Sequence, residues 1–115
     1  MRTFLVVLFA VAPLPAQTGA QTQAQRDAIA ANRANYTKFE YMVPVRDGVK
    51  LFTSVYIPKD VFTEGKSYPI LLQRTPYNVA PYGADHYRAS LGPSDLFAPE
   101  KFIFVYKMVY SPSLI

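Results

Sequence analysis

Apolar and polar residues alternate along two neighbouring stretches of the chain, residues 38–46 and 49–57. A period of two is typical of a β-strand with one face on a core. Between the stretches lies Asp47-Gly48, which predicts a two-residue type I′ hairpin turn because glycine tolerates the positive φ that this turn requires. Pro44 has no N–H to donate, which places the first strand at an edge of the sheet or Pro44 at a bulge. The apolar face of the predicted hairpin consists of Phe39, Tyr41, Val43, Val45, Val49, Leu51, Val55 and Ile57, with Thr53 among them.

Two later stretches are apolar without alternation. Residues 70–72 are Ile-Leu-Leu and residues 102–106 are Phe-Ile-Phe-Val-Tyr. Continuous apolar runs of this length predict strands that are covered on both faces. The connection between them is long and interrupted by proline and glycine, so it has room for at most one short helix, around residues 84–91. A hairpin followed by two buried strands with such a crossover predicts an α/β fold whose mixed sheet turns parallel.

The first residues of the chain have a different composition. Met1 and Arg2 precede an apolar run, which two prolines end by residue 15. This is the layout of a secretory signal peptide. The run is too short for a transmembrane helix, which needs about 20 residues, so no stable membrane anchor is expected. Small residues favour cleavage near Ala20, or after Ala16 as the second option. The protein is therefore expected to be exported, to the periplasm or out of the cell.

Residues 21–35 are rich in alanine and glutamine and contain few large apolar side chains. We expect a mobile arm there, which can be helical but has little to bury. The predicted organisation of the chain is then a signal peptide at residues 1–20, the arm at 21–35, the folded part at 36–106 and a divergent tail at 107–115.

Composition argues against several classes of function. The 115 residues include 12 Lys and Arg against 8 Asp and Glu. The basic residues stand singly among acidic ones, which argues against a nucleic-acid surface. The chain has no cysteine, so neither a disulfide nor a thiolate is available. No spacing of histidine and carboxylate residues predicts a zinc or calcium site, and no cofactor is expected.

Three segments resemble one family of enzymes. They are YMVPVRDGVKL at residues 41–51, VYIP at 55–58 and PILLQRTPYN at 69–78. Together they closely resemble the start of the CocE/NonD serine hydrolases, a group with cocaine-esterase-like enzymes, α-amino-acid ester hydrolases, glutaryl and cephalosporin acylases and X-Pro dipeptidyl-peptidases. The resemblance covers about residues 36–106. It implies the N-terminal part of an α/β-hydrolase fold and an enzyme that cleaves esters or amides through an acyl-enzyme.

Tyr77 is the one catalytic residue that the resemblance transfers to this chain. The family uses the hydroxyl of the tyrosine in a Pro-Tyr motif as an oxyanion donor, and that motif is Pro76-Tyr77 here. A loop at the carboxyl end of a buried strand is where α/β proteins place their chemistry, and an oxyanion needs donors mounted on a rigid element. From the residues alone, a tyrosine packed at a loop with its hydroxyl on the backbone is the alternative.

The serine nucleophile, the acid and the base are expected outside this chain. The α/β-hydrolases carry them in the order Ser, Asp or Glu, His. The single histidine, His86, therefore comes too early to be the base and is expected to be an ordinary loop or helix residue. No serine has the glycine flanks of a G-x-S-x-G turn.

The resemblance ends after residue 106, where the family typically continues with a Gln-Asp-Val-Arg-Gly-Arg type of segment that residues 107–115 lack. We therefore expect the N-terminal fragment of an exported serine hydrolase that is inactive alone, with a small-molecule ester or amide as the substrate of the full enzyme. A small exported β-rich binding module without catalysis stays open as the alternative. The two strands that are apolar on both faces also predict that the segment associates with itself when its cover is missing.

Overall fold

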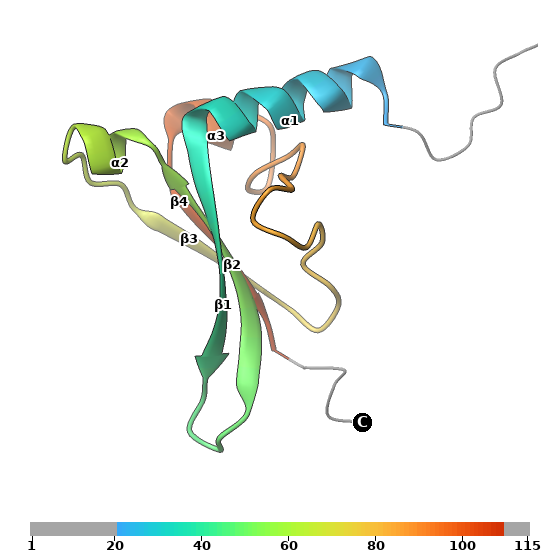
Figure 1. Cartoon of the computed structure of the whole chain (residues 1–115), viewed down its shortest axis with the longest axis vertical. Coiled ribbons are helices and arrows are strands. Elements are labelled where there is room, and N and C mark those ends of the chain that lie inside the picture. The colour runs from blue at the N-terminus through green and yellow to red at the C-terminus, as the bar shows by residue number, and fades with distance from the viewer. Residues whose placement is uncertain (1–20, 110–115) are drawn as a thin grey trace, which may run out of the picture.

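The computed structural model describes residues 21–109 (Figure 1). Their strands form one four-stranded sheet in the order β1-β2-β4-β3, in which β1 and β2 as well as β2 and β4 are antiparallel, while β3 and β4 are parallel. The predicted mixed sheet that turns parallel at its last pair is confirmed. In chain order the elements are α1 (Gln23–Asn35), β1 (Tyr36–Pro44), β2 (Lys50–Pro58), α2 (Asp60–Thr63), β3 (Ile70–Thr75), α3 (Phe97–Glu100) and β4 (Ile103–Met108).

Two predicted segments lie at the limits of the described residues. The signal peptide predicted for residues 1–20 lies outside them, and so do residues 110–115 of the predicted tail. The start of that tail belongs to the sheet, since β4 continues through Lys107 and Met108.

The turn of the β1-β2 hairpin differs from the two-residue turn that the sequence predicts. The Gly48 N–H donates to the Val45 carbonyl oxygen over 2.9 Å, and the Val45 N–H donates to the Val49 carbonyl oxygen over 2.8 Å. Gly48 has a φ of 80°, whereas Asp47 has no positive φ. These bonds define a three-residue loop with a left-handed glycine at its end, so the type I′ prediction is wrong. The edge position that Pro44 predicts for β1 is confirmed by the strand order.

The two faces of the sheet are covered unequally. One face is aromatic and packs against Val79 and Leu91 of the crossover between β3 and β4. The other face carries the aliphatic residues, and on it Ile70 and Leu72 are 63% and 50% exposed. The alternation of the sequence thus predicts the strands, but the aromatic core lies on the face opposite to the predicted one, of which only Leu51 and Thr53 in β2 are buried. The residues of the buried face are Tyr36, Tyr56, Phe104, Tyr106 and Met108.

This reversal has a physical reason. Tyrosine and lysine carry an apolar body and a polar tip, so they enter a core when the tip finds a partner. The hydroxyl of Tyr36 donates to the carbonyl oxygen of Ala98, and the ammonium group of Lys38 donates to carbonyl oxygens of the crossover. A scale that ranks residues by polarity alone places both on the solvent side.

Strand β3 does not have the cover that its apolar sequence predicts. Within residues 21–109 it is an edge strand, and four of its six residues are exposed. The prediction of a strand covered on both faces is therefore wrong for this structure. The helix expected around residues 84–91 is absent as well, and the short helix of the crossover comes later, as α3.

Helix α1 is exposed along most of its length but is attached at its last turn. It begins with a capping box, in which Thr22 and Gln25 exchange side-chain and backbone hydrogen bonds, so two otherwise free N–H groups are satisfied. Asn32, near its end, is buried. Figure 1 shows α1 lying across the crossover, which is drawn in orange. The arm predicted for residues 21–35 is thus helical, and its end is joined to the domain.

Candidate active-site loop

Tyr77 lies in the loop that begins where β3 ends at Thr75. Its side chain is 78% exposed, and its hydroxyl has no hydrogen-bond partner among residues 21–109. The Tyr77 N–H donates to Thr75 Oγ1 over 3.1 Å, and the Ala80 N–H donates to Asn78 Oδ1 over 3.2 Å. Such local bonds from side chain to backbone fix the course of a turn. The structure therefore presents a solvent-facing phenol on a braced loop, and a hydroxyl bonded to the backbone is not observed.

The segment after Tyr77 is anchored in the core. Val79 is fully buried against the aromatic face of the sheet. Beyond it, residues 80–92 form no helix or strand, so their backbone carbonyl groups depend on partners outside regular structure.

The side chain of Lys38 supplies three of these partners. Its Nζ donates to the carbonyl oxygens of Pro81 (2.6 Å), Gly83 (3.0 Å) and His86 (2.8 Å). It also lies 3.2 Å from Glu40 Oε1, an atom that accepts a hydrogen bond from the Gly83 N–H as well. Because β1 holds Lys38 and Glu40 on one face, two residues apart, they reach the same stretch of the crossover.

The end of α1 supplies two further side chains. Together with Lys38, they form a set that we call the carbonyl cradle, defined as Asn32, Arg33 and Lys38. Sequence reasoning missed this set, because a polar residue at a helix end or on a strand carries no local signal that it will bind a backbone carbonyl group some fifty residues later. The further bonds run from Asn32 Nδ2 to Arg88 (2.7 Å) and Ala89 (3.0 Å), and from Arg33 to Asp85.

His86 lies in this crossover with its side chain exposed. Its carbonyl oxygen is held by Lys38, and its N–H donates to the Gly83 carbonyl oxygen over 3.0 Å. Both contacts are made by the backbone, so the imidazole plays no part in them. Among the serines, Ser54 is fully buried in β2, and its hydroxyl has no partner within the described part of the chain.

Buried tyrosines dominate the electrostatics beneath the loop. Burial raises the pKa of Tyr36 to about 12, and it raises the pKa of Tyr56 as well, because the phenolate form loses its hydration. The guanidinium group of Arg88 lies 4.3 Å from the ring centroid of Tyr106, an arrangement that favours the cation. The phenols of Tyr36 and Tyr56 thus stay neutral through the physiological range.

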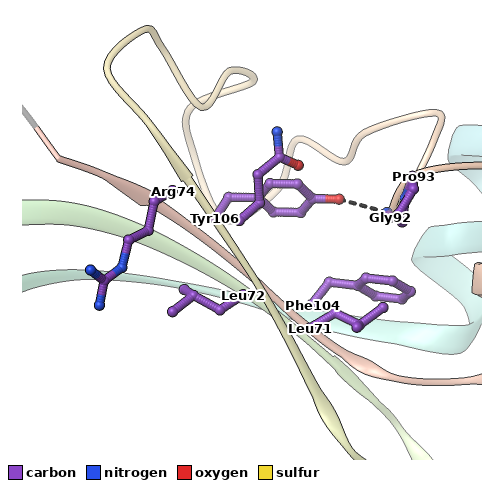
Figure 2. A pocket seen from close by; sticks show the side chains of 8 residues that line it. Leu71, Leu72, Arg74, Gly92, Pro93, Phe104 and Tyr106 are labelled. Carbon is purple, nitrogen blue, oxygen red and sulfur yellow. Dashed lines mark hydrogen bonds between the residues drawn. The ribbon is translucent and has the colours of Figure 1, made fainter.

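A groove of about 500 Å³ opens beside the free edge of β3, and Tyr77 is not part of its lining. Figure 2 shows Tyr106 reaching across the groove, where its hydroxyl accepts a 2.8 Å hydrogen bond from the Gly92 N–H. The groove is thus a hydrophobic cleft on the sheet, separate from the Tyr77 loop. It is lined by Leu71, Leu72, Gln73, Arg74, Gly92, Pro93, Phe104 and Tyr106.

Residues 21–109 contain neither a cluster of metal-ligand side chains nor a helix that could cross a membrane. No group of three or more His, Cys, Asp or Glu side chains in this part of the chain comes together as a metal site. In the same residues, no helix has the length and the apolar character that crossing a membrane requires.

Comparisons with known proteins connect this geometry to hydrolases. No family model matches the chain, and no curated protein matches it. Among solved structures, an α-amino acid ester hydrolase is 35% identical over 83% of this chain, with a TM-score of 0.50. An aminopeptidase from a marine sediment Thaumarchaeota archaeon is 30% identical over 88% of the chain, also with a TM-score of 0.50.

The resemblance to the CocE/NonD hydrolases is confirmed, because over most of its length the chain is similar to an ester hydrolase of that family and to an aminopeptidase. The chain is thus a hydrolase-like segment with a four-stranded mixed sheet. It spans only 15% of each of these two structures.

Proposed function

We propose that this chain is the N-terminal portion of the catalytic domain of an exported serine hydrolase that cleaves small esters or amides through an acyl-enzyme. The observation that carries the proposal is the Pro-Tyr loop at the end of β3, in a sheet of order β1-β2-β4-β3 whose last pair is parallel. The α/β-hydrolases take one oxyanion donor from the loop that follows their third strand. The place of Tyr77 in this chain agrees with that rule.

The role of Tyr77 is to donate its phenolic O–H to the oxyanion of the tetrahedral intermediate. A phenol is a more acidic donor than an aliphatic alcohol. The hydroxyl of Tyr77 has no hydrogen-bond partner among residues 21–109, so it is free to bind a substrate. Donors of this kind act when they are fixed before the reaction, since they then cost no reorganisation. The local hydrogen bonds that Thr75 and Asn78 accept support such fixation of the loop backbone.

In this proposal the chain corresponds to the beginning of a longer hydrolase. The serine, the acid and the histidine belong to the other, larger part of that hydrolase. His86 is excluded as the base by its place before any nucleophile turn, and its backbone, not its ring, makes its contacts with Gly83 and Lys38. Export rests on the signal-peptide pattern of residues 1–20. The chain alone is inactive, so an activated ester is expected to show no turnover above background in its presence.

A chimera tests the proposal. Residues 21–109 replace the matching segment of the similar α-amino acid ester hydrolase, which supplies the rest of the catalytic machinery, and hydrolysis of an amino-acid ester is measured. We expect an active chimera in which Tyr77→Phe lowers kcat by about 10²-fold, the cost of removing one oxyanion donor. The control is Tyr41→Phe, at an exposed tyrosine of β1, which leaves kcat unchanged. Near-normal turnover of the Tyr77→Phe chimera would remove Tyr77 from the mechanism.

A non-catalytic binding module is the second candidate function, and the groove beside β3 supports it. The groove is mostly apolar and has a volume within the range of small-molecule pockets. A folded but inactive chimera, together with saturable binding of an apolar ligand that Gln73→Trp abolishes by filling the groove from an exposed position of β3, favours this candidate over the hydrolase.

A further inference from the structure

The crossover between β3 and β4 has an unusual number of backbone carbonyl groups that are bonded to side chains. A loop that runs along a protein normally points its carbonyl groups to water, whereas six carbonyl groups between residues 81 and 89 accept hydrogen bonds from the carbonyl cradle. An irregular segment with this many side-chain partners is held in one course. Of the three cradle residues, Lys38 makes half of the bonds.

The Lys38 ammonium group is fully buried, since its side chain is 0% exposed. A buried charge is tolerated only when it is paired and hydrogen-bonded. Lys38 meets both conditions, because an ammonium group has three donors, three carbonyl oxygens accept from it, and Glu40 balances its charge. The ring of Tyr56 lies 5.5 Å from Nζ and adds an aromatic face.

The bonds of Lys38 begin four residues after Tyr77. On the other side, Tyr77 is braced by Thr75, and between Tyr77 and Pro81 the core residue Val79 fixes the backbone. The loop is therefore a short span held at both ends, and its far end is held by Lys38. If Lys38 lets go of Pro81, the stretch from Asn78 to Pro81 depends on Val79 in the core and on the bonds of Ala80 to Asn78 and Arg88 alone. A larger range of motion at Tyr77 is then the expected effect.

We propose that Lys38 is a positioning residue for Tyr77, which it orients by gathering the carbonyl oxygens of Pro81, Gly83 and His86. The catalytic meaning of this role rests on the proposed function, whereas the ordering of the loop does not. The two ideas can therefore fail separately. A loop that is ordered by Lys38 but carries no catalytic tyrosine contradicts only the proposed function.

Hydrogen exchange in the full chain tests the ordering of the loop. Lys38→Met keeps the length and apolar stem of the side chain and removes its three donors. We expect the amides of Gly83 and His86 to exchange about tenfold faster or more in this variant, while the amides of the β1-β2 ladder keep their protection. The control is Lys50→Met, because Lys50 is an exposed lysine of β2; it leaves exchange in residues 80–88 unchanged.

The orientation of Tyr77 needs a readout of its own. In the full chain labelled with 3-fluorotyrosine, the resonance of Tyr77 is identified by its loss in Tyr77→Phe. We expect Lys38→Met to shift or broaden this resonance, while that of Tyr41, at the far hairpin, stays unchanged. Arg33→Met, on the exposed surface of α1, is a milder variant. It frees one carbonyl group, that of Asp85, and removes the guanidinium group from the ring of Tyr87, and we expect a smaller change in the same direction.

Three results would overturn the proposal. The first is unchanged exchange of Gly83 and His86 in Lys38→Met. The second is a loss of protection that spreads evenly over the β1-β2 ladder, which assigns Lys38 a general structural role. The third is a Tyr77 resonance that stays the same while the loop amides exchange faster, since the loop would then move without its tyrosine.

Discussion

The Tyr36 hydroxyl donates a 2.7 Å hydrogen bond to the carbonyl oxygen of Ala98. This contact joins the first residue of β1 to helix α3, and Tyr36 also packs on Phe104 of β4 with 5.8 Å between the ring centroids. One side chain thus connects the N-terminal strand, the crossover and the central strand of the sheet. The stability of the aromatic core should therefore depend on this phenol remaining neutral.

Alkaline pH tests this dependence. The pKa of Tyr36 is raised from 10.0 to about 12, chiefly because burial disfavours the phenolate. A folded-state pKa above the unfolded one gives stability that is complete below pH 10 and is lost as the pH rises through about 12. Tyr36→Phe lacks this component. We expect Tyr36→Phe to lower the free energy of unfolding at pH 8 by about 1 kcal/mol, the net contribution of the lost hydrogen bond. The difference in free energy of unfolding between the parent and Tyr36→Phe should become smaller as the pH rises, because only the parent loses stability when Tyr36 ionises.

Urea unfolding followed by circular dichroism between pH 8 and pH 12 measures both effects. Tyr41→Phe serves as the control, since Tyr41 is half exposed on the edge strand, and it should follow the parent chain at every pH. A constant difference between the parent and Tyr36→Phe across this range would contradict the linkage.

Acid pH tests a second contact, between Asp60 and Lys101. Their atoms Oδ2 and Nζ lie 2.6 Å apart, and the Tyr68 hydroxyl donates to the same oxygen over 2.7 Å. The hydrogen bond from Lys101, and after it the one from Tyr68, holds the pKa of Asp60 below its ordinary value of 3.8. A lowered folded-state pKa gives stability that is present above that value and is lost as the pH falls through the folded-state pKa.

Asp60→Asn is therefore expected to lower the unfolding midpoint at neutral pH. The difference from the parent should narrow as the pH falls through the lowered pKa of Asp60, because the parent then loses the charge of its carboxylate. Asp47→Asn, at an exposed carboxylate of the hairpin loop, provides the control and leaves the midpoint unchanged. An equal deficit of Asp60→Asn at neutral and acid pH would show that the charge of Asp60 is irrelevant.

Gly92 is expected to tolerate no side chain. Its φ is 78°, and a Cβ at this position would lie 2.8 Å from Cε1 of Phe104 and 3.0 Å from Cβ of Phe97. Gly92→Ala therefore combines a left-handed alanine with overpacking of the core, and we expect it to cost about 2–4 kcal/mol in the free energy of unfolding.

Gly65 offers a matched control, because its φ is 66° and no atom lies within 4 Å of a Cβ there. Gly65→Ala bears the backbone cost alone, about 1–2 kcal/mol. Denaturant unfolding of both variants separates the two terms. Equal losses in the two variants would mean that the contact with Phe104 carries no strain.

The aliphatic face of the sheet predicts self-association. Ile70 and Leu72 expose 63% and 50% of their surface on an edge strand, and exposed apolar edges pair with other chains. Ile70→Lys with Leu72→Lys should shift the chain toward the monomer in size-exclusion chromatography over a range of concentrations. Ala24→Lys with Ser67→Lys adds the same charge at exposed positions elsewhere and should leave association unchanged. Equal effects of the two pairs would point to net charge alone.

The sequence predicts the strands of this fold well because a period of two depends only on local geometry. It also predicts the parallel pair, since a long crossover between two apolar runs allows little else. The face of the core could not be predicted in this way. Tyr36 and Lys38 lie on the buried side because distant carbonyl groups meet their polar ends, and no periodicity carries that information.

In the candidate site, too, local features could be predicted from the sequence and long-range contacts could not. Tyr77 could be found because Pro-Tyr is a local motif that a resemblance transfers. Lys38 could not be found, because its partners are more than forty residues away in the chain. The turn at Gly48 was also missed, because a two-residue and a three-residue loop need the same left-handed glycine and differ only in the register of the strands.

The seclusion of Lys38 has a consequence for the chemical reactivity of the chain. An acylating reagent attacks amines that water can reach, and the Nζ atom of Lys38 is enclosed by the crossover. Lys38 should thus be the last lysine to be acetylated, and the moment of its modification marks the opening of the segment above it. The rate at which Lys38 is acetylated, followed by mass spectrometry, therefore reports how often the crossover opens in the unsubstituted chain.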